Sequence, residues 1–297
     1  MGEQLKLMYT VVFDVFSLAS LRKTAIRTII AGLYFYALEY LEDNWIDINF
    51  HIPQYIFYLL GYILVTLFYY KIGTSYYRWY DGRKYWSYLG TRGKNLAQQL
   101  NAILDKDDHV SRKYFAKMIT NHAYSLKANL RGSNPLEEIY EITPGFKDEL
   151  KAEKDKPNYI ISIISDKINQ LYMSGRIKQY HFLGTNRYMN DLVEINEQCK
   201  GIKKVPSPTS YTFHLRTFLI LFTICLPFGF VHDHNFIMTF IMMIIYGAYE
   251  GSLVVTEEME EPFGLDKYDI PLDDICYSIK KHTHQLLGVE LKSSSHH

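Results

Sequence analysis

Basic side chains are missing from two long windows of this chain. Lys and Arg are absent from Thr28 to Tyr70, and again from Thr217 to Asp266. A helix that faces water normally carries charged residues along its exposed side, so such gaps are unusual in a soluble helical protein. The pattern favours membrane-spanning helices, and the alternative is that the same segments are buried core helices of a soluble scaffold.

Each window has the length of a helical hairpin. The first predicts spans over about residues 26–40 and 54–70, with an acidic turn between them, and Pro53 marks the start of the second span. The second window predicts spans over residues 215–231 and 236–255, joined by the turn HDHN. A span needs about 20 predominantly apolar residues. The stretch 48–70 meets this length, whereas the other apolar runs are shorter and need tilt or polar flanks.

Basic residues flank the hairpins on alternating sides. They occur before the first span, after the second and after the fourth, and neither hairpin turn carries one: Lys6, Arg22, Lys23 and Arg27; Lys71, Arg78, Arg83, Lys84, Arg92 and Lys94; Lys267, Lys280 and Lys281. Because positive charge is retained on the cytoplasmic side, this alternation predicts four spans in the inner membrane of the cell with both termini in the cytoplasm.

The predicted organisation follows from these spans. Residues 1–70 form an N-terminal segment and the first hairpin, and residues 71–214 form a cytoplasmic domain. Residues 215–255 form the second hairpin, and residues 256–297 form an acidic cytoplasmic segment with a tail. The middle section carries apolar residues at spacings of three and four, as in HVSRKYFAKMITNHAYSLKANL, which indicates helices. We therefore expect an all-α membrane protein.

Composition narrows the function further. A net charge of +0 argues against nucleic-acid binding, which needs a basic surface. Tyr is abundant, with 26 residues, and the stretch YYRWYDGRKYW at Tyr76–Trp86 follows directly on the longest apolar run. Tyr and Trp collect at the water interface of a bilayer, although an aromatic-rich core would also use them. We interpret this stretch as the helix leaving the membrane.

Sequence motifs for covalent chemistry are missing. The chain has no GxGxxG, GxxxxGK[ST] or GxSxG motif, and its histidines form no HExxH pair. An enzyme is therefore not expected. The acidic stretch TEEMEEPFGLDKYDIPLDD, residues 256–274, offers oxygen ligands of the kind that calcium takes, but it lacks the EF-hand spacing. The alternative is a solvated acidic face that pairs with nearby Arg side chains.

Several of these motifs together resemble the bestrophin family in its bacterial form. They are RWYDGRKYW after an apolar helix, VPSPTSYTFHL before the third span, and EEPFGLDKYDIPLDD after the fourth. The resemblance runs from near Phe13 to near Leu286. It implies a homopentameric ion channel with four spans per subunit, an axial pore and a helical cytoplasmic domain. It also implies that the permeant ions are chloride or other anions.

The resemblance places a narrow pore neck on the second span. In the family three apolar residues at a spacing of four form this neck, and counting back from Arg78 gives Tyr62, Thr66 and Tyr70. These positions share one face of a helix. Each carries a hydroxyl group, so this neck differs from a purely hydrophobic constriction, which gates by dewetting. The alternative is that the three side chains only pack within a helix bundle.

The resemblance implies two further sites. A second constriction lies in the cytoplasmic domain, and counting back from Tyr211 gives Met189, with Ile202 as a nearby alternative. Asp266 and Asp269 match two acids of the calcium clasp in animal bestrophins. Other residue types interrupt the acidic run at Leu265, Lys267 and Tyr268, so calcium or another divalent metal is an open question and no other cofactor is expected.

The expected function is passive conduction of small ions through the pore, with membrane lipid and four further copies of the chain as partners. A cation-conducting homologue remains open, since the acidic turn from Glu42 to Asp47 would favour sodium if it faced the entrance. A membrane carrier is a further alternative, because Pro227 and Gly229 could break the third span as transporter helices are broken.

Overall fold

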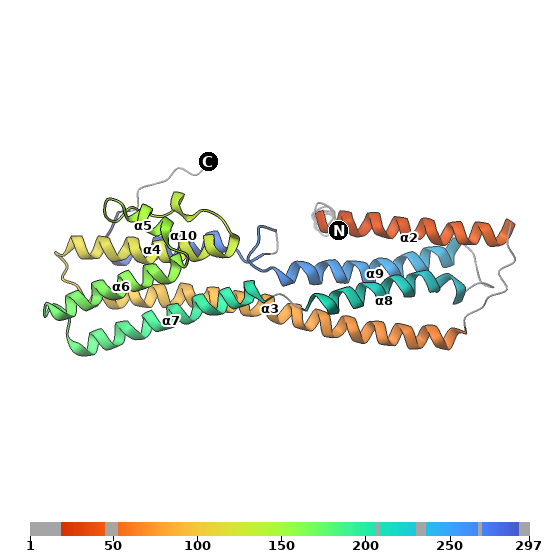
Figure 1. Ribbon diagram of the computed structural model, residues 1–297, viewed down its shortest axis with the longest axis horizontal. Helices are drawn as coiled ribbons and strands as arrows, with labels where there is room; N and C mark the ends of the chain where they lie inside the picture. Colours follow the sequence, from red (N-terminus) through yellow and green to blue (C-terminus); the bar gives the residue numbers. More distant parts are fainter. Residues whose placement is uncertain (1–18, 45–52, 206–207, 230–235, 267–268, 291–297) are drawn as a thin grey trace, which may run out of the picture. The chain divides into compact units, whose positions relative to one another are not determined.

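The computed structural model describes residues 19–44, 53–205, 208–229, 236–266 and 269–290. Within these residues every regular element is a helix (Figure 1). Their bounds are α2 Ala19–Asn44, α3 Gln54–Ile103, α4 His109–Arg131, η1 Pro135–Glu137, α5 Phe146–Ala152, α6 Lys156–Met173, α7 Gln179–Lys204, α8 Thr209–Cys225, η2 Leu226–Gly229, α9 Phe236–Glu260 and α10 Leu272–Leu286. The expectation of an all-α protein is confirmed for this part of the chain.

The helices divide into two compact units. The first comprises the described parts of residues 1–79 and 206–260, and the second those of residues 80–205 and 261–297. The charge pattern put the corresponding boundaries after residues 70, 214 and 255. Helix α3 continues without a break past the first of these boundaries. The division into membrane hairpins and cytoplasmic segments stays a prediction.

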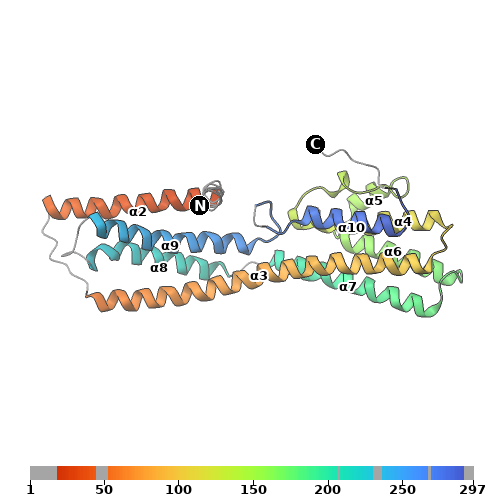
Figure 2. The same ribbon diagram turned by 180° about the vertical axis from the view of Figure 1, so that it is seen from behind.

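The first unit contains α2, α8, η2, α9 and the N-terminal part of α3. In both ribbon views α9 lies between α2 and α8 (Figures 1 and 2). Apolar side chains from these helices share one core: Ala31, Phe35, Phe57, Leu64, Phe68, Leu215, Leu219, Phe222, Leu226, Met242 and Leu253. The apolar residues that sequence analysis assigned to membrane spans therefore also hold the four helices together.

Helices α2 and α9 approach each other closely where α2 carries Gly32. A Cβ atom at this position would overlap Sδ of Met243 on α9. Small residues permit such an approach, and membrane proteins use them at helix interfaces for this reason. The glycine thus lets Met243 pack directly against the backbone of α2.

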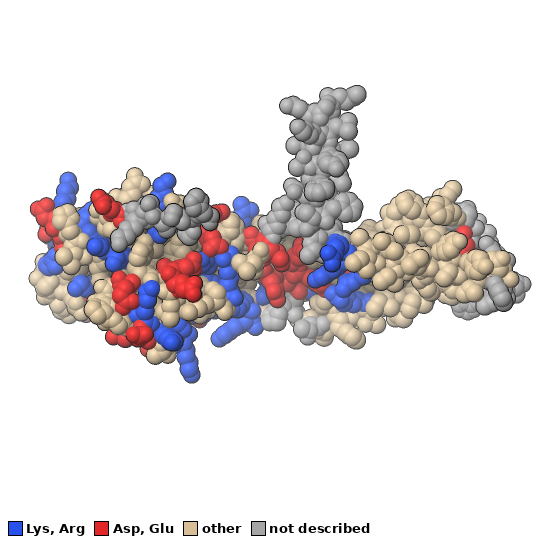
Figure 3. All heavy atoms as spheres, turned by 90° about the horizontal axis from the view of Figure 1, so that it is seen from above, with Lys and Arg blue, Asp and Glu red and all other residues tan. Residues whose placement is uncertain are grey.

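Three helices in the described residues are long and apolar enough to cross a membrane. They lie in α3, in α8 with η2 (Ser210–Gly229), and in α9. Helix α2 is not one of the three, since it carries basic residues near its start and acidic residues near its end. On the face shown in Figure 3 the surface of the first unit is mostly uncharged, as expected beside lipid.

The second unit packs α4 against α10 and α6, and α6 in turn against α7. Its core includes Trp86 and Leu96 of α3, Phe115 of α4 and Ile164 of α6. Both ends of α4 are defined by local interactions. The side chain of Asp108 accepts a hydrogen bond from the backbone N–H of Ser111, and Gly132 ends the helix in a left-handed conformation with φ 68°.

Candidate functional site

Helix α3 has two distinct faces within the first unit. Phe57, Leu64 and Phe68 point into the core and are at most 7% exposed. Their spacing of seven and four residues repeats along one side of the helix. Residues on the other side are exposed, and most of them are aromatic: Tyr55, Tyr58, Leu59, Tyr62, Val65, Tyr69, Tyr70, Tyr76 and Tyr77. A single chain thus presents an aromatic surface rich in hydroxyl groups along α3.

The three residues that the resemblance placed at a pore neck belong to this exposed surface. Tyr62 is 72% exposed, Tyr70 is 61% exposed, and Thr66 between them is also exposed. The hydroxyl of Thr66 donates to the backbone carbonyl oxygen of Tyr62 at 2.8 Å. Its proton is therefore used within the helix, and the oxygen lone pairs face outward as acceptors. A role of the three residues in a pore remains a prediction.

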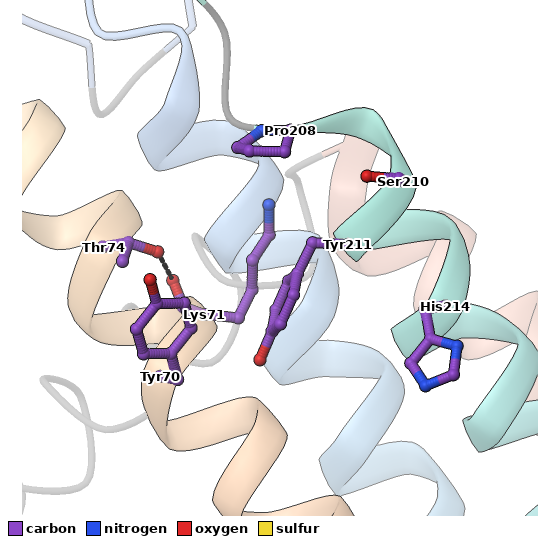
Figure 4. Close-up of a pocket in the computed structure, with 7 residues that line it drawn as sticks. All are labelled: Tyr70, Lys71, Thr74, Pro208, Ser210, Tyr211 and His214. Carbon is purple, nitrogen blue, oxygen red and sulfur yellow. Dashed lines mark hydrogen bonds between the residues drawn. The ribbon is translucent and has the colours of Figure 1, made fainter.

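Tyr70 also contacts α8. Its ring meets the ring of Tyr211 edge-on, with centroids 5.4 Å apart. Tyr211 is fixed in turn, because its hydroxyl donates to the backbone carbonyl oxygen of Leu67 at 2.9 Å. The aromatic pair therefore couples the position of Tyr70 to the first turns of α8 (Figure 4).

Lys71, the next residue, is almost completely buried, with 1% of its surface exposed. Its ammonium group donates to the hydroxyl of Thr212 at 2.8 Å and forms an ion pair with the carboxylate of Glu260. Ser75 donates to the same carboxylate at 3.2 Å, and Arg78 donates to the backbone carbonyl oxygen of Glu260 at 2.6 Å. Buried charge is tolerated only when it is paired and hydrogen-bonded in this way. These contacts hold the C-terminal end of α9 against α3.

Two further acids of α9 are paired with bases from other helices of the first unit. Glu250 forms an ion pair with Arg27 of α2, and Glu257 forms one with Arg216 of α8. The acidic stretch that begins at the end of α9 therefore serves in part to bind neighbouring helices. The alternative that acids of this stretch pair with nearby Arg side chains holds for Glu257, whereas the carboxylate of Glu260 pairs with Lys71.

Sequence reasoning missed the role of Lys71. The charge pattern places it among several basic residues that follow the second span, whereas the structure buries it. One signal was available, because Lys71 is the only Lys or Arg between Thr28 and Tyr77, and no Asp or Glu lies within residues 54–77. Its partner, 189 residues further along the chain, could not be identified by pattern.

The residues considered for a cytoplasmic constriction lie in α7. Met189 is 3% exposed and belongs to the core of the second unit, and Ile202 is half-buried against the same core. The side chain of Met189 thus has almost no surface in the single chain. A constriction at this residue remains a prediction.

The two acids considered for a metal lie in the turn before α10. The backbone N–H of Asp266 donates to Oδ2 of Asp269 at 2.7 Å, and the N–H of Asp269 donates to the carbonyl oxygen of Asp266 at 3.0 Å. Among the residues that the structure describes, no group of three or more His, Cys, Asp or Glu side chains could hold a metal ion. The Asp269 carboxylate thus accepts a hydrogen bond from the backbone of the same turn.

Hydrogen-bonded polar side chains run from the buried His122 to the surface of the second unit. Nε2 of His122 donates to Oδ1 of Asn196 at 3.1 Å, and Asn196 donates to Asn158 at 2.7 Å. Asn158 then donates to Asp155 and Glu197, both at 2.8 Å. Burial lowers the pKa of His122 to about 4, so the imidazole is neutral at physiological pH and holds α4 against α7.

Comparison with known proteins identifies the family. A model of the Bacterial/Fungal Bestrophin protein family matches residues 8–285, which is nearly the whole chain. This chain belongs to the bacterial and fungal bestrophin family. The match covers the region over which the sequence motifs resembled bestrophins, from near Phe13 to near Leu286, so that expectation is confirmed.

Relatives and solved structures agree with this membership. A voltage-dependent anion channel-forming protein of Nostoc sp. is 27% identical over 244 residues, covering 80% of this chain and 78% of the relative. The Escherichia coli protein YneE, with the same description, is 26% identical over 262 residues, covering 88% and 85%. A crystal structure of a bacterial bestrophin homolog from Klebsiella pneumoniae superposes with a TM-score of 0.83 at 24% identity, covering 90% of this chain and 99% of that one. The bestrophin fold therefore describes almost all of this chain.

Proposed function

We propose that this bestrophin forms a passive ion channel for chloride and other small anions. The relatives in Nostoc sp. and Escherichia coli carry the description "voltage-dependent anion channel-forming protein", which supports conduction of anions. The work of such a channel is desolvation and electrostatic selection along a narrow path, without covalent chemistry.

The observation that carries the proposal is the exposed face of α3. In a membrane, tyrosine hydroxyls that face hydrocarbon lack partners, and an unsatisfied polar group there is costly. A wet pathway bordered by other copies of the chain supplies partners for these hydroxyls. We therefore place Tyr62, Thr66 and Tyr70 at the neck of the pore, where their hydroxyl groups keep the path hydrated.

The proposed assembly is a homopentamer in the inner membrane of the cell, with both termini in the cytoplasm. Helix α2 serves as the remaining span beside the three apolar ones. Two features support this role. Its core-facing side packs on α9 through Ala31 and Phe35, and its other side exposes large apolar residues: Ile29, Ile30 and Leu33. The acidic and basic residues of α2 lie towards its two ends, where they reach the membrane surfaces.

The test is flux through the purified protein in liposomes, with chloride and sodium gradients set independently. A reversal potential that follows the chloride gradient is expected. One that follows sodium would retain the channel and overturn its anion selectivity. If protein shown to be folded in the bilayer carried no current under any gradient, the channel itself would be contradicted.

A further inference from the structure

The exposed face of α3 carries two phenol hydroxyls that the chain itself leaves unpaired. Tyr62 is 72% exposed and Tyr70 is 61% exposed. Tyr62 contacts Thr66 through its backbone carbonyl oxygen, and Tyr70 contacts Tyr211 through its ring. Among the residues that the structure describes, neither hydroxyl has a hydrogen-bond partner. Each O–H group is therefore available to a partner from outside the chain.

Thr66 lies between the two tyrosines and differs in what it offers. Its hydroxyl proton is donated to the carbonyl oxygen of Tyr62 at 2.8 Å, so its oxygen presents lone pairs alone. An anion is held by hydrogen-bond donors and not by acceptors. A phenol hydroxyl can turn its proton towards an anion, whereas Thr66 would first have to break its bond within the helix. Of the three neck residues, only the tyrosines thus offer a donor.

The spacing of the two tyrosines separates their hydroxyls along the path. Eight residues of one helix lie between these positions, which corresponds to about 12 Å along the helix axis. Thr66 lies midway, about one turn from each. Where copies of the chain surround one axis, each position forms a ring, so the neck has two donor rings with an acceptor ring between them. This spacing leaves room for water between an ion at one donor ring and an ion at the other.

We propose that the hydroxyls of Tyr62 and Tyr70 form two separate anion sites in the neck, at which phenol O–H groups replace part of the hydration shell of the ion. Hydrogen bonds to an ionised partner are about twice as strong as those between neutral groups. Two moderate sites let one ion enter while another leaves. At the level of Thr66 the ion keeps its water. The inference rests on the proposed anion channel and adds which groups hold the ion there.

Two donor sites in one neck have consequences for selectivity. Chloride holds its water tightly, so it gains more from replacement donors than weakly hydrated thiocyanate does. Loss of a phenol hydroxyl should therefore favour thiocyanate. Two ions in one neck should also make the conductance of chloride–thiocyanate mixtures pass through a minimum below the conductance of either pure salt.

The experiment compares full-length wild type with Y62F and Y70F in planar bilayers. Each variant loses one oxygen atom from an exposed side chain, so the fold should be kept, and the melting temperature in detergent checks this. Y36F is the matched control, since Tyr36 on α2 is 54% exposed and lies on the same side of that helix as the exposed Leu33. The readouts are the permeability ratio of thiocyanate to chloride, from reversal potentials, and the conductance across mixtures of the two salts.

In Y62F and in Y70F we expect this permeability ratio to rise about threefold or more, which corresponds to one hydrogen bond of ordinary strength. The conductance minimum should disappear in both, because a single site remains, and Y36F should match the wild type. An unchanged ratio in either variant would overturn the two-site arrangement. A lower melting temperature with an unchanged ratio would assign that hydroxyl to a contact between copies of the chain and overturn its role as an anion site. An equal rise in Y36F would also overturn the inference.

The wild type separates this inference from the proposed function. A wild-type current that follows chloride, with variants that do not differ from it, would leave the anion channel in place and overturn the tyrosine sites alone. A wild-type current that follows sodium, or no current from folded protein, would overturn both.

Discussion

Lys71 of α3 and Glu260 at the end of α9 form an ion pair in which the lysine is 1% exposed and the glutamate side chain 19%. The pair lies one residue after Tyr70, on the opposite side of α3 from the exposed tyrosines. It therefore opposes rotation of α3 about its own axis, because rotation would separate the buried ammonium group from the carboxylate that balances its charge.

Removal of one partner of this pair should destabilise the protein strongly. K71M leaves the carboxylate of Glu260 without its partner, and E260Q leaves the ammonium group of Lys71 without its counter-charge. For K71M we expect the free energy of unfolding to fall by about 3–5 kcal/mol. The double variant K71M/E260Q should recover part of the loss, since neither charge then remains. Thermal unfolding of the wild type, the two single variants and the double variant in detergent gives the coupling energy between the two residues. Additive losses would show that the two residues do not act as a pair.

The Thr66 hydroxyl should matter to conduction through hydration of the neck. T66V keeps the size of the side chain but replaces an outward-facing oxygen by a methyl group, so we expect single-channel conductance to fall several-fold. T66S should retain most of it. T217V is the matched control, since Thr217 on α8 is also exposed and also donates to a carbonyl four residues earlier. Equal conductance in T66V and wild type would remove Thr66 from the neck.

The contact between Gly32 and Met243 should be sensitive to added volume. G32L forces a side chain into the space of Met243 and should cost about 1–3 kcal/mol, seen as a lower melting temperature. M243A in the same chain should restore part of the loss, because it removes the atoms that a Cβ at Gly32 would meet. If M243A lowered the melting temperature of G32L further, the contact between residues 32 and 243 would not limit how closely α2 and α9 approach each other.

Buried histidines should make the second unit sensitive to acid. Burial lowers the pKa of His122 and of His284 to about 4, whereas an unfolded histidine titrates near about 6.5. The unfolded chain therefore binds more protons between these values, and stability should fall as the pH drops from about 6.5 towards 4, with no further loss from these groups below that. The measurement is the melting temperature as a function of pH.

The variant H122Q separates the two histidines. Glutamine can still donate to Oδ1 of Asn196 but does not titrate. The melting temperature of H122Q should therefore fall less steeply towards low pH, and the remaining fall is the contribution of His284. H282Q, at an exposed histidine, should leave the profile unchanged. A profile for H122Q that coincides with wild type would exclude His122 as a source of the acid sensitivity.

The sequence alone determined the helical class, three long apolar helices and the family. The gaps in Lys and Arg marked the membrane-facing segments, and Pro53 correctly predicted that α3 begins at Gln54. These features are local, because hydrophobic period, helix-starting residues and short motifs are all properties of contiguous residues. The motifs RWYDGRKYW and EEPFGLDKYDIPLDD were specific enough to name the bestrophins.

Only the tertiary structure decided which residues are buried and which pairs form. Lys71 and Arg78 stand close together in a basic flank, yet Lys71 is buried against Glu260 while Arg78 binds the carbonyl of the same residue. Met189 and Tyr62 were both proposed for constrictions, yet Met189 lies in a core and Tyr62 is exposed. Burial depends on which helix packs against which face, and this is set by contacts between residues far apart in the chain that no local pattern encodes.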